Sequence, residues 1–124
     1  MRRLPLLLVG IDFAGALPAQ AAAPLSRIQV VALEFHYRLS RVRVPAGPVR
    51  IELANFGQDE HDLTLQRDGS ATIYHLPKAL PGPRQIINLR LKPGVYRLSC
   101  SLADHAMRGM HSQLRVVAPK PKRR

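Results

Sequence analysis

The chain has 124 residues with 11 prolines and a single cysteine, so its length suits one domain and an internal disulfide is ruled out. Hydrophobic residues make up 46% of the chain, yet no uncharged apolar run approaches the roughly 20 residues that a membrane-spanning helix needs. The net charge is +11, but tryptophan is absent and aromatic residues are only 5%, so few side chains are available to stack with single-stranded nucleic acid.

Residues 1–21 have the layout of a secretory signal. A positive start is followed by the apolar stretch 4–11 and then by small residues that end at Ala21. Asp12 departs from the usual pattern, and the alternative is a frayed strand or helix at the N-terminus. We expect cleavage after Ala21 and a soluble protein that is periplasmic or otherwise exported, with one domain over residues 22–118.

The next part of the chain alternates apolar and polar residues with a period of two, and no segment shows sustained helical periodicity. Each such strand has one apolar face, so two sheets must cover one another. We therefore predict an all-β fold, a two-sheet Greek-key β-sandwich of seven to eight strands. The alternating positions are Ile28 and Val30; Tyr37 and Leu39; Val42 and Val44; Val49, Ile51 and Leu53; Leu63 and Leu65; Ile87, Leu89 and Leu91; Tyr96 and Leu98; Leu114 and Val116.

Proline and glycine mark the connections between these strands. Residues 45–48 and 92–94 predict turns that join neighbouring strands. The stretch 67–84 contains Asp68-Gly69 and three prolines and predicts an irregular connection with at most one helical turn. Residues 119–124 carry four positive charges and no large apolar side chain, which predicts a basic, disordered tail.

The segment after the strand at Tyr96 and Leu98 carries the chemistry. Cys100, His105 and Met110 follow one another at equal spacing, which places a thiol, an imidazole and a thioether in one loop. Soft sulfur donors with imidazole favour copper, and two histidines, one cysteine and a distant methionine form the blue electron-transfer site. A second histidine is therefore needed.

His61 is the best candidate for that histidine. Strand alternation places His61 on the inward face of Leu63 and Leu65, and it places Cys100 on the inward face of its own strand. Both side chains would then project between the sheets at one end of the sandwich. His36, His75 and His111 have no comparable setting, and we interpret them as surface or structural residues, with His111 the nearest to the ligands.

The sequence resembles the cupredoxin family, the plastocyanin and azurin type of small blue copper protein, over residues 26–118. The matched features are Asn55-Phe56-Gly57, His61-Asp62, Pro93-Gly94-Val95-Tyr96, Cys100, His105, Met110 and Leu114-Arg115-Val116-Val117. The resemblance implies one type 1 copper ion, with His61, Cys100 and His105 as equatorial ligands and Met110 as the axial ligand. It also implies that Asp62 ties the strand of the first ligand to Ser101, and that Asn55 and Asp104 lie around the ligands.

Two positions depart from the family's pattern. Asp104 stands where the family commonly has glycine before the second histidine, and its negative charge predicts a lowered reduction potential. Met107 is two residues from His105 and could compete for the axial position, but its spacing favours Met110.

The predicted function is one-electron transfer in the cell envelope, with no enzymatic activity of its own. The main alternative is a protein that binds and delivers copper without redox turnover, which the additional Met107 and His111 favour. Cys100 and His105 as a nucleophile and base are a weaker alternative, because they leave the methionine unexplained and no oxyanion donor is evident.

The net positive charge indicates what kinds of partner the protein could bind. Nucleic acid is one such partner, because basic side chains can neutralise its phosphates, but export argues against it. The charge is consistent with steering toward an acidic redox protein or with peripheral contact with an anionic membrane, or the basic residues simply coat a solvated sheet face. We expect a monomer.

Overall fold

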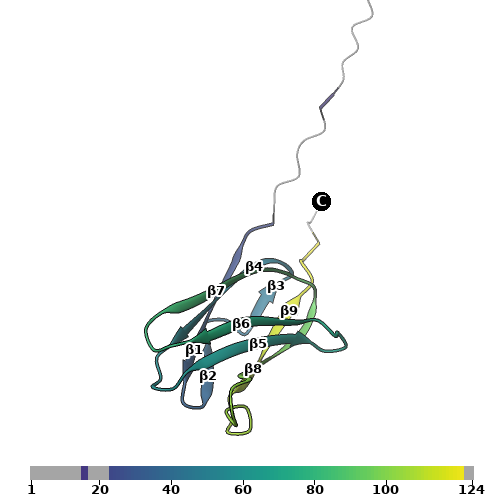
Figure 1. Ribbon diagram of the computed structural model, residues 1–124. Coiled ribbons are helices and arrows are strands. Elements are labelled where there is room, and N and C mark those ends of the chain that lie inside the picture. The colour runs from purple at the N-terminus through teal and green to yellow at the C-terminus, as the bar shows by residue number, and fades with distance from the viewer. Residues whose placement is uncertain (1–14, 17–22, 122–124) are drawn as a thin grey trace, which may run out of the picture.

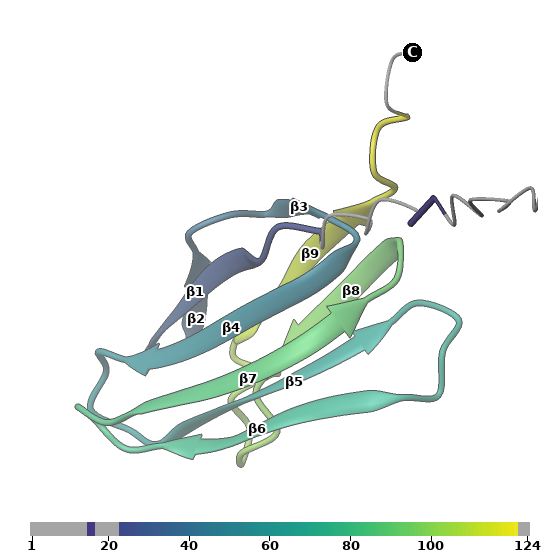
Figure 2. The ribbon, with the colours of Figure 1, turned by 90° about the horizontal axis from the view of Figure 1, so that it is seen from above.

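In the computed structural model, which describes residues 15–16 and 23–121, two β-sheets pack face to face (Figure 1, Figure 2). The first sheet has the order β2 (His36–Leu39), β1 (Ser26–Leu33), β4 (Gly47–Asn55), β7 (Arg84–Leu91). The second has the order β3 (Arg43–Pro45), β9 (His111–Val117), β8 (Gly94–Ser99), β5 (His61–Arg67), β6 (Ile73–Ala79). The β1–β4 and β3–β9 pairs are parallel and the other pairs are antiparallel.

The predicted all-β sandwich is confirmed. The described residues form nine strands and no helix, one or two strands more than the sequence indicated. None of the described residues belongs to a helix long and apolar enough to cross a membrane.

Alternating side chains from both sheets fill the space between them. Val49, Ile51 and Leu53 from β4 face Leu63 and Leu65 from β5, and all five are fully buried. Burying each such side chain contributes about 1.5–3 kcal/mol, which is why the apolar alternation determines which face of each strand turns inward. The same alternation turns His61 and Cys100 toward this interior.

The expectation of an irregular connection over 67–84 is wrong. Ile73–Ala79 forms β6, which pairs with β5 at one edge of the second sheet. The proline in this strand, Pro77, is tolerated because an edge strand can lack one backbone donor, and the pairing shifts register between His61 and Leu63 to accommodate the extra residue.

Both predicted turns connect strands that lie in different sheets, rather than neighbouring strands of one sheet. Ala46 alone separates β3 from β4, and Lys92 and Pro93 separate β7 from β8. Gly94 then has a φ of 147°, a value that side chains rarely permit.

One end of the sandwich collects the residues of interest. The end of β4, the start of β5 and the end of β8 meet there, and the loop 100–110 extends from this end at the bottom of Figure 1. The predicted signal 1–21 lies outside the described residues except for 15–16, as do residues 122–124 of the predicted tail.

Candidate metal centre

Three buried side chains converge where β5 begins and β8 ends. His61 is the first residue of β5, Cys100 follows β8 directly, and His105 lies in the loop that leads to β9. One ligand atom from each of the three lies within 4.8 Å of the others. The inward orientation predicted from alternation therefore brings His61 and Cys100 together, although 39 positions separate them in the sequence.

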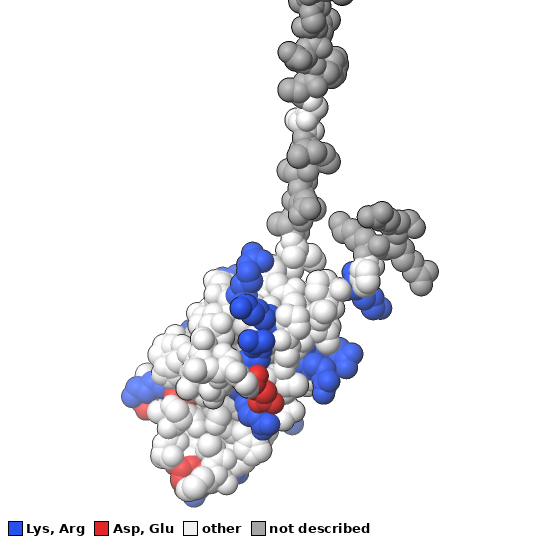
Figure 3. All heavy atoms as spheres, turned by 90° about the vertical axis from the view of Figure 1, so that its right-hand side faces the viewer, with Lys and Arg blue, Asp and Glu red and all other residues white. Residues whose placement is uncertain are grey.

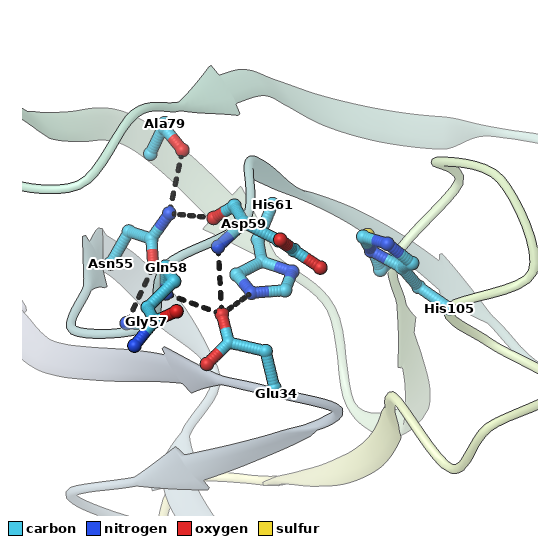
Figure 4. Close-up of polar contacts among 9 residues, drawn as sticks. Glu34, Asn55, Gly57, Gln58, Asp59, His61, Ala79 and His105 are labelled. Atoms are coloured by element: carbon cyan, nitrogen blue, oxygen red, sulfur yellow. Dashed lines mark hydrogen bonds and ion pairs between the residues drawn. The ribbon is translucent and has the colours of Figure 1, made fainter.

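The two histidine rings and the thiol enclose one small space. Cys100 Sγ lies 3.6 Å from His105 Nδ1, and the centroids of the His61 and His105 rings are 5.1 Å apart at an angle of 57°. Figure 4 shows the His61 ring on the side of β5 and the His105 ring reaching toward it from the loop. Nitrogen and sulfur donors therefore face a common point from three directions.

The His61 ring is oriented by its outer nitrogen. Nε2 lies 3.2 Å from Glu34 Oε1, whereas Nδ1 is buried and has no hydrogen-bond partner among the described residues. A buried nitrogen without a partner costs about 1–3 kcal/mol, so few stay unpaired unless something else binds them. A metal ion bound by Nδ1 would remove this cost.

Met110 is placed by the backbone of the same loop. Cys100 N donates to Met110 O and Met110 N donates to His105 O, both at 3.1 Å. The Met110 side chain is fully buried, whereas the Met107 side chain is 86% exposed. This difference in burial favours Met110 over Met107 as the fourth donor.

The donor set fits one copper ion of type 1. Two imidazoles, one thiol and one buried thioether are the soft and borderline donors that copper prefers, and the closed, apolar surroundings match an electron-transfer site. No carboxylate is among the three converging groups, which disfavours magnesium or calcium.

Solved structures with a similar architecture include one whose name describes it as a blue copper protein. No family model matches the sequence, and no curated protein matches it either. The chain is similar to auracyanin A, a "blue" copper protein from Chloroflexus aurantiacus, with 17% identity, a TM-score of 0.62 and coverage of 76% of this chain and 100% of that one. Rusticyanin from Thiobacillus ferrooxidans has 12% identity and a TM-score of 0.64, with coverage of 77% of this chain and 79% of that one. A reduced single-site mutant of amicyanin has 16% identity and a TM-score of 0.57, with coverage of 74% of this chain and 83% of that one.

The chain therefore has a cupredoxin-like fold. At these identities the likeness establishes the architecture alone, and the role of each candidate ligand rests on the geometry of this chain's own residues.

Asp62 joins the first histidine's strand to the ligand loop. Its carboxylate accepts hydrogen bonds from Ser101 N at 2.7 Å, from the Ser101 hydroxyl and from His75 Nε2 at 2.9 Å. Burial works to raise the pKa of Asp62, but these hydrogen bonds outweigh burial and lower it. The link to Ser101 is the one that the family resemblance implies, and His75 extends it to β6.

Asn55 arranges the loop before β5. Its amide nitrogen donates to Asp59 O at 2.6 Å and to Ala79 O at 2.9 Å, and its side-chain oxygen accepts from Gly57 N at 2.8 Å (Figure 4). Because Ala79 pairs with His61 at the start of β5, Asn55 holds both sides of the first ligand.

Glu34 is a functional residue that the sequence did not reveal. Its carboxylate contacts His61 and also accepts hydrogen bonds from Gln58 N at 2.5 Å and Asp59 N at 2.8 Å (Figure 4). The Asp59 N–H makes the largest contribution to lowering the pKa of Glu34. A Cβ on Gly57 would overlap this carboxylate, so a larger residue there would have to displace the Glu34 side chain.

Phe35 shields the imidazoles and was likewise not predicted. Its ring centroid is 4.9 Å from that of His105 and 6.4 Å from that of His61, and the Arg108 guanidinium lies over it at 4.4 Å. Neither Glu34 nor Phe35 belongs to a recognisable motif, and both lie far from the nearest ligand in sequence, so only the fold brings them to the site.

Asp104 lies at the rim of the loop 100–110. Its carboxylate is half exposed and pairs with Arg108 Nε at 3.1 Å. The charge expected to lower the reduction potential is thus partly compensated by a cation one turn later.

The Cys100 thiol is closed to bulk solvent. Burial is the main reason that the pKa of Cys100 is raised. A buried thiol with a raised pKa is poorly suited to attack a substrate but is suited to hold a metal that displaces its proton.

Proposed function

We propose that this protein is a cupredoxin that binds one copper ion and carries single electrons. The observation that supports this most strongly is the convergence of His61, Cys100 and His105, with the buried Nδ1 of His61 left without a partner among the described residues. A copper ion at this point would supply one-electron chemistry by alternating between Cu(I) and Cu(II).

The chain contributes a fixed set of donors. His61, Cys100 and His105 would form the plane of ligands, with Met110 as the more distant fourth. The ligands sit on or between strands, and the backbone bonds between Cys100, His105 and Met110 tie the loop to itself. A framework that does not rearrange between oxidation states favours rapid electron transfer, and no substrate bond needs to be made or broken, so we propose no enzymatic activity.

We propose that a redox protein docks at the ligand-bearing end. His105 is adjacent to Ala106 and close to the exposed side chain of Met107, and the loops beside it expose Phe56 and Leu80. An apolar rim of this kind can exclude water and bring a partner close to the imidazole.

The second candidate function is copper delivery. Met107 lies in the loop 100–110 and His111 follows it directly, and both are exposed, so they offer soft and borderline donors to an incoming or departing ion.

An exchange experiment distinguishes the two functions. Copper-loaded protein is cycled repeatedly between ascorbate and ferricyanide in the presence of a Cu(I) chelator, and the copper that remains bound is measured. We expect an electron carrier to retain its copper; loss to the chelator within the first reduced phase would favour delivery.

We also propose that the protein is exported by cleavage after Ala21. The support is the sequence pattern of residues 1–21 alone. Expression of the full chain in a bacterial host, followed by fractionation and intact-mass measurement, should give a periplasmic product that begins at Ala22. An uncleaved cytoplasmic product would contradict this proposal.

A further inference from the structure

A small basic pocket lies at the opposite end of the sandwich from the ligands. Its volume is about 100 Å³, and it lies between the β5–β6 hairpin and the β7–β8 turn. Arg67 and His61 are the two ends of β5, so about 20 Å of strand separates the pocket from the first ligand. The pocket is lined by Arg67, Ser70, Thr72, Tyr74, Arg90, Lys92 and Tyr96.

Three cations line this pocket without an acidic partner. Among the described residues, Arg67, Arg90 and Lys92 form no ion pair, whereas Lys78, Arg84, Arg97 and Arg108 each pair with a carboxylate. Arg67 Nη1 donates to Pro93 O at 3.3 Å, which leaves its other N–H groups free of acceptors among those residues. No carboxylate of the described part of the chain lines the pocket.

Hydroxyl groups complete the lining. Ser70 Oγ accepts a hydrogen bond from Thr72 N at 3.2 Å, so its own proton remains available. The Tyr96 hydroxyl accepts from Lys92 N at 3.1 Å and donates to Lys92 O at 2.9 Å, which fixes the backbone of the turn that carries Lys92. The pocket therefore combines positive charge with the hydroxyl proton of Ser70 and with a fixed turn that carries Lys92.

A second hollow, on the outer face of the first sheet, has a different character. Glu52 lies in it, accepts a hydrogen bond from Gln29 Nε2 and pairs with Arg84. The carboxylate of Glu52 thus partly neutralises the positive charge of this second hollow. Of these two hollows, only the pocket lined by Arg67, Arg90 and Lys92 has cations and no carboxylate in its lining.

We propose that the pocket at Arg67, Arg90 and Lys92 binds a phosphate group. Three cations exceed what one carboxylate would neutralise, and a tetrahedral dianion can accept charge-assisted hydrogen bonds from three sides. Free inorganic phosphate and the phosphate of an anionic lipid headgroup share this chemistry. Figure 3 views the molecule from the side of the β5–β6 hairpin and shows a row of lysine and arginine atoms with acidic atoms at its lower end.

The position of the pocket has a consequence for orientation. A phosphate carried by a surface would hold the protein by the end remote from the loop 100–110. The ligand-bearing end would then remain free for a redox partner. Phosphate binding itself does not depend on copper, so its failure would leave the proposed electron-transfer function untouched.

The test uses two variants with the same change in charge. Arg90→Gln/Lys92→Gln removes two pocket cations, and Arg43→Gln/Arg115→Gln removes two exposed cations that are register partners on β3 and β9, outside the pocket. Inorganic phosphate is titrated at constant ionic strength against chloride, and amide chemical shifts are followed. We expect saturable shifts around the pocket, weakened about tenfold or more in the pocket variant and less than about twofold in the surface variant.

Vesicles of phosphatidylcholine with and without phosphatidic acid identify the source of the phosphate. Loss of vesicle binding in the pocket variant alone indicates the lipid headgroup, whereas saturable inorganic phosphate binding with vesicle binding equal in both variants indicates the free ion. Thermal unfolding of each variant verifies its fold. The proposal is overturned if neither phosphate nor vesicle binding depends on the pocket cations more than on Arg43 and Arg115.

Discussion

Among individual residues, Glu34 is expected to have the largest influence on the candidate ligands, although it is not a ligand itself. Its carboxylate contacts His61 Nε2 and is itself held by two backbone N–H groups. A hydrogen bond from an imidazole to a carboxylate increases the electron density at the opposite nitrogen and fixes the ring. This contact should stabilise Cu(II) more than Cu(I).

We predict that Glu34→Gln raises the reduction potential. The amide keeps an acceptor near His61 but removes the charge, and a tenfold relative loss of Cu(II) affinity corresponds to about 59 mV for one electron. Voltammetry of the loaded protein measures the shift. Glu60→Gln is the matched control because Glu60 pairs with exposed Lys78. Equal shifts in both variants would show that net charge, and not the contact with His61, sets the effect.

Asp104→Asn should also raise the reduction potential, but by less than Glu34→Gln, because Arg108 compensates the charge of Asp104.

Asp62 should matter for stability. We predict that Asp62→Ala lowers the free energy of unfolding of the copper-free protein by about 2–3 kcal/mol, because hydrogen bonds to a charged group are lost and Ser101 is left unpaired. Urea unfolding of the copper-free protein measures this, and Asp62→Asn should lose less because the amide oxygen can still accept from Ser101 N.

The pH dependence follows from the lowered pKa of Asp62. A carboxyl group whose pKa is lower in the folded than in the unfolded state stabilises the fold at pH above its unfolded pKa of about 4, and this stabilisation is lost as the pH falls through the folded pKa. The copper-free wild type should therefore lose more stability than Asp62→Asn as the pH is lowered, in the range of about pH 4 and below. Parallel curves for the two proteins would contradict this account of Asp62.

The raised pKa of Cys100 predicts that copper binding releases a proton. The thiol is protonated at neutral pH and the bound metal requires the thiolate, so the apparent copper affinity should increase about tenfold per pH unit near neutrality. Competition with a chelator of known pH dependence measures this slope. An affinity that does not change with pH around neutrality would mean that the thiol does not bind the metal.

The sequence identified the residues that converge at the candidate site better than it identified their surroundings. The spacing of Cys100, His105 and Met110 and the strand alternation at His61 are local patterns, so they can be recognised without a structure. Glu34 and Phe35 follow β1 in a turn with no pattern of its own, and their contact with the histidines depends on how two sheets pack.

Strand β9 allows a test of which side chains of a strand turn toward the interior between the sheets. Leu114 is fully buried and its neighbour Gln113 is exposed. We predict that Leu114→Ala costs about 2–5 kcal/mol of unfolding free energy, because it leaves a cavity between the sheets, and that Gln113→Ala changes stability by less than about 0.5 kcal/mol. Chemical denaturation measures both. Similar losses for the two variants would contradict the alternation on which the position of the ligands depends.

Alternation identified most strands but not β6. Successive apolar residues on one face are a sufficient signal for β4 and β5, which lie inside their sheets. β6 contains Pro77 and a register shift and lies at an edge, where pairing on one side only relaxes the demand for regular alternation.

For the whole molecule, the arrangement separates two regions along the strands. The candidate copper ligands and the exposed Phe56, Leu80 and Met107 lie at one end, and the basic pocket lies at the other. Composition predicted the excess of positive charge but not its position, because the location of Arg67, Arg90 and Lys92 in one pocket requires the hairpin and the turn to meet across the two sheets.

The visible and electron paramagnetic resonance spectra of the protein loaded with Cu(II) test the central assignment most directly. We predict an intense blue colour and the small copper hyperfine splitting of a type 1 site, both lost in Cys100→Ser while the fold persists. A colourless Cu(II) protein, or a spectrum that Cys100→Ser leaves unchanged, would contradict the assignment of the thiol as a copper ligand.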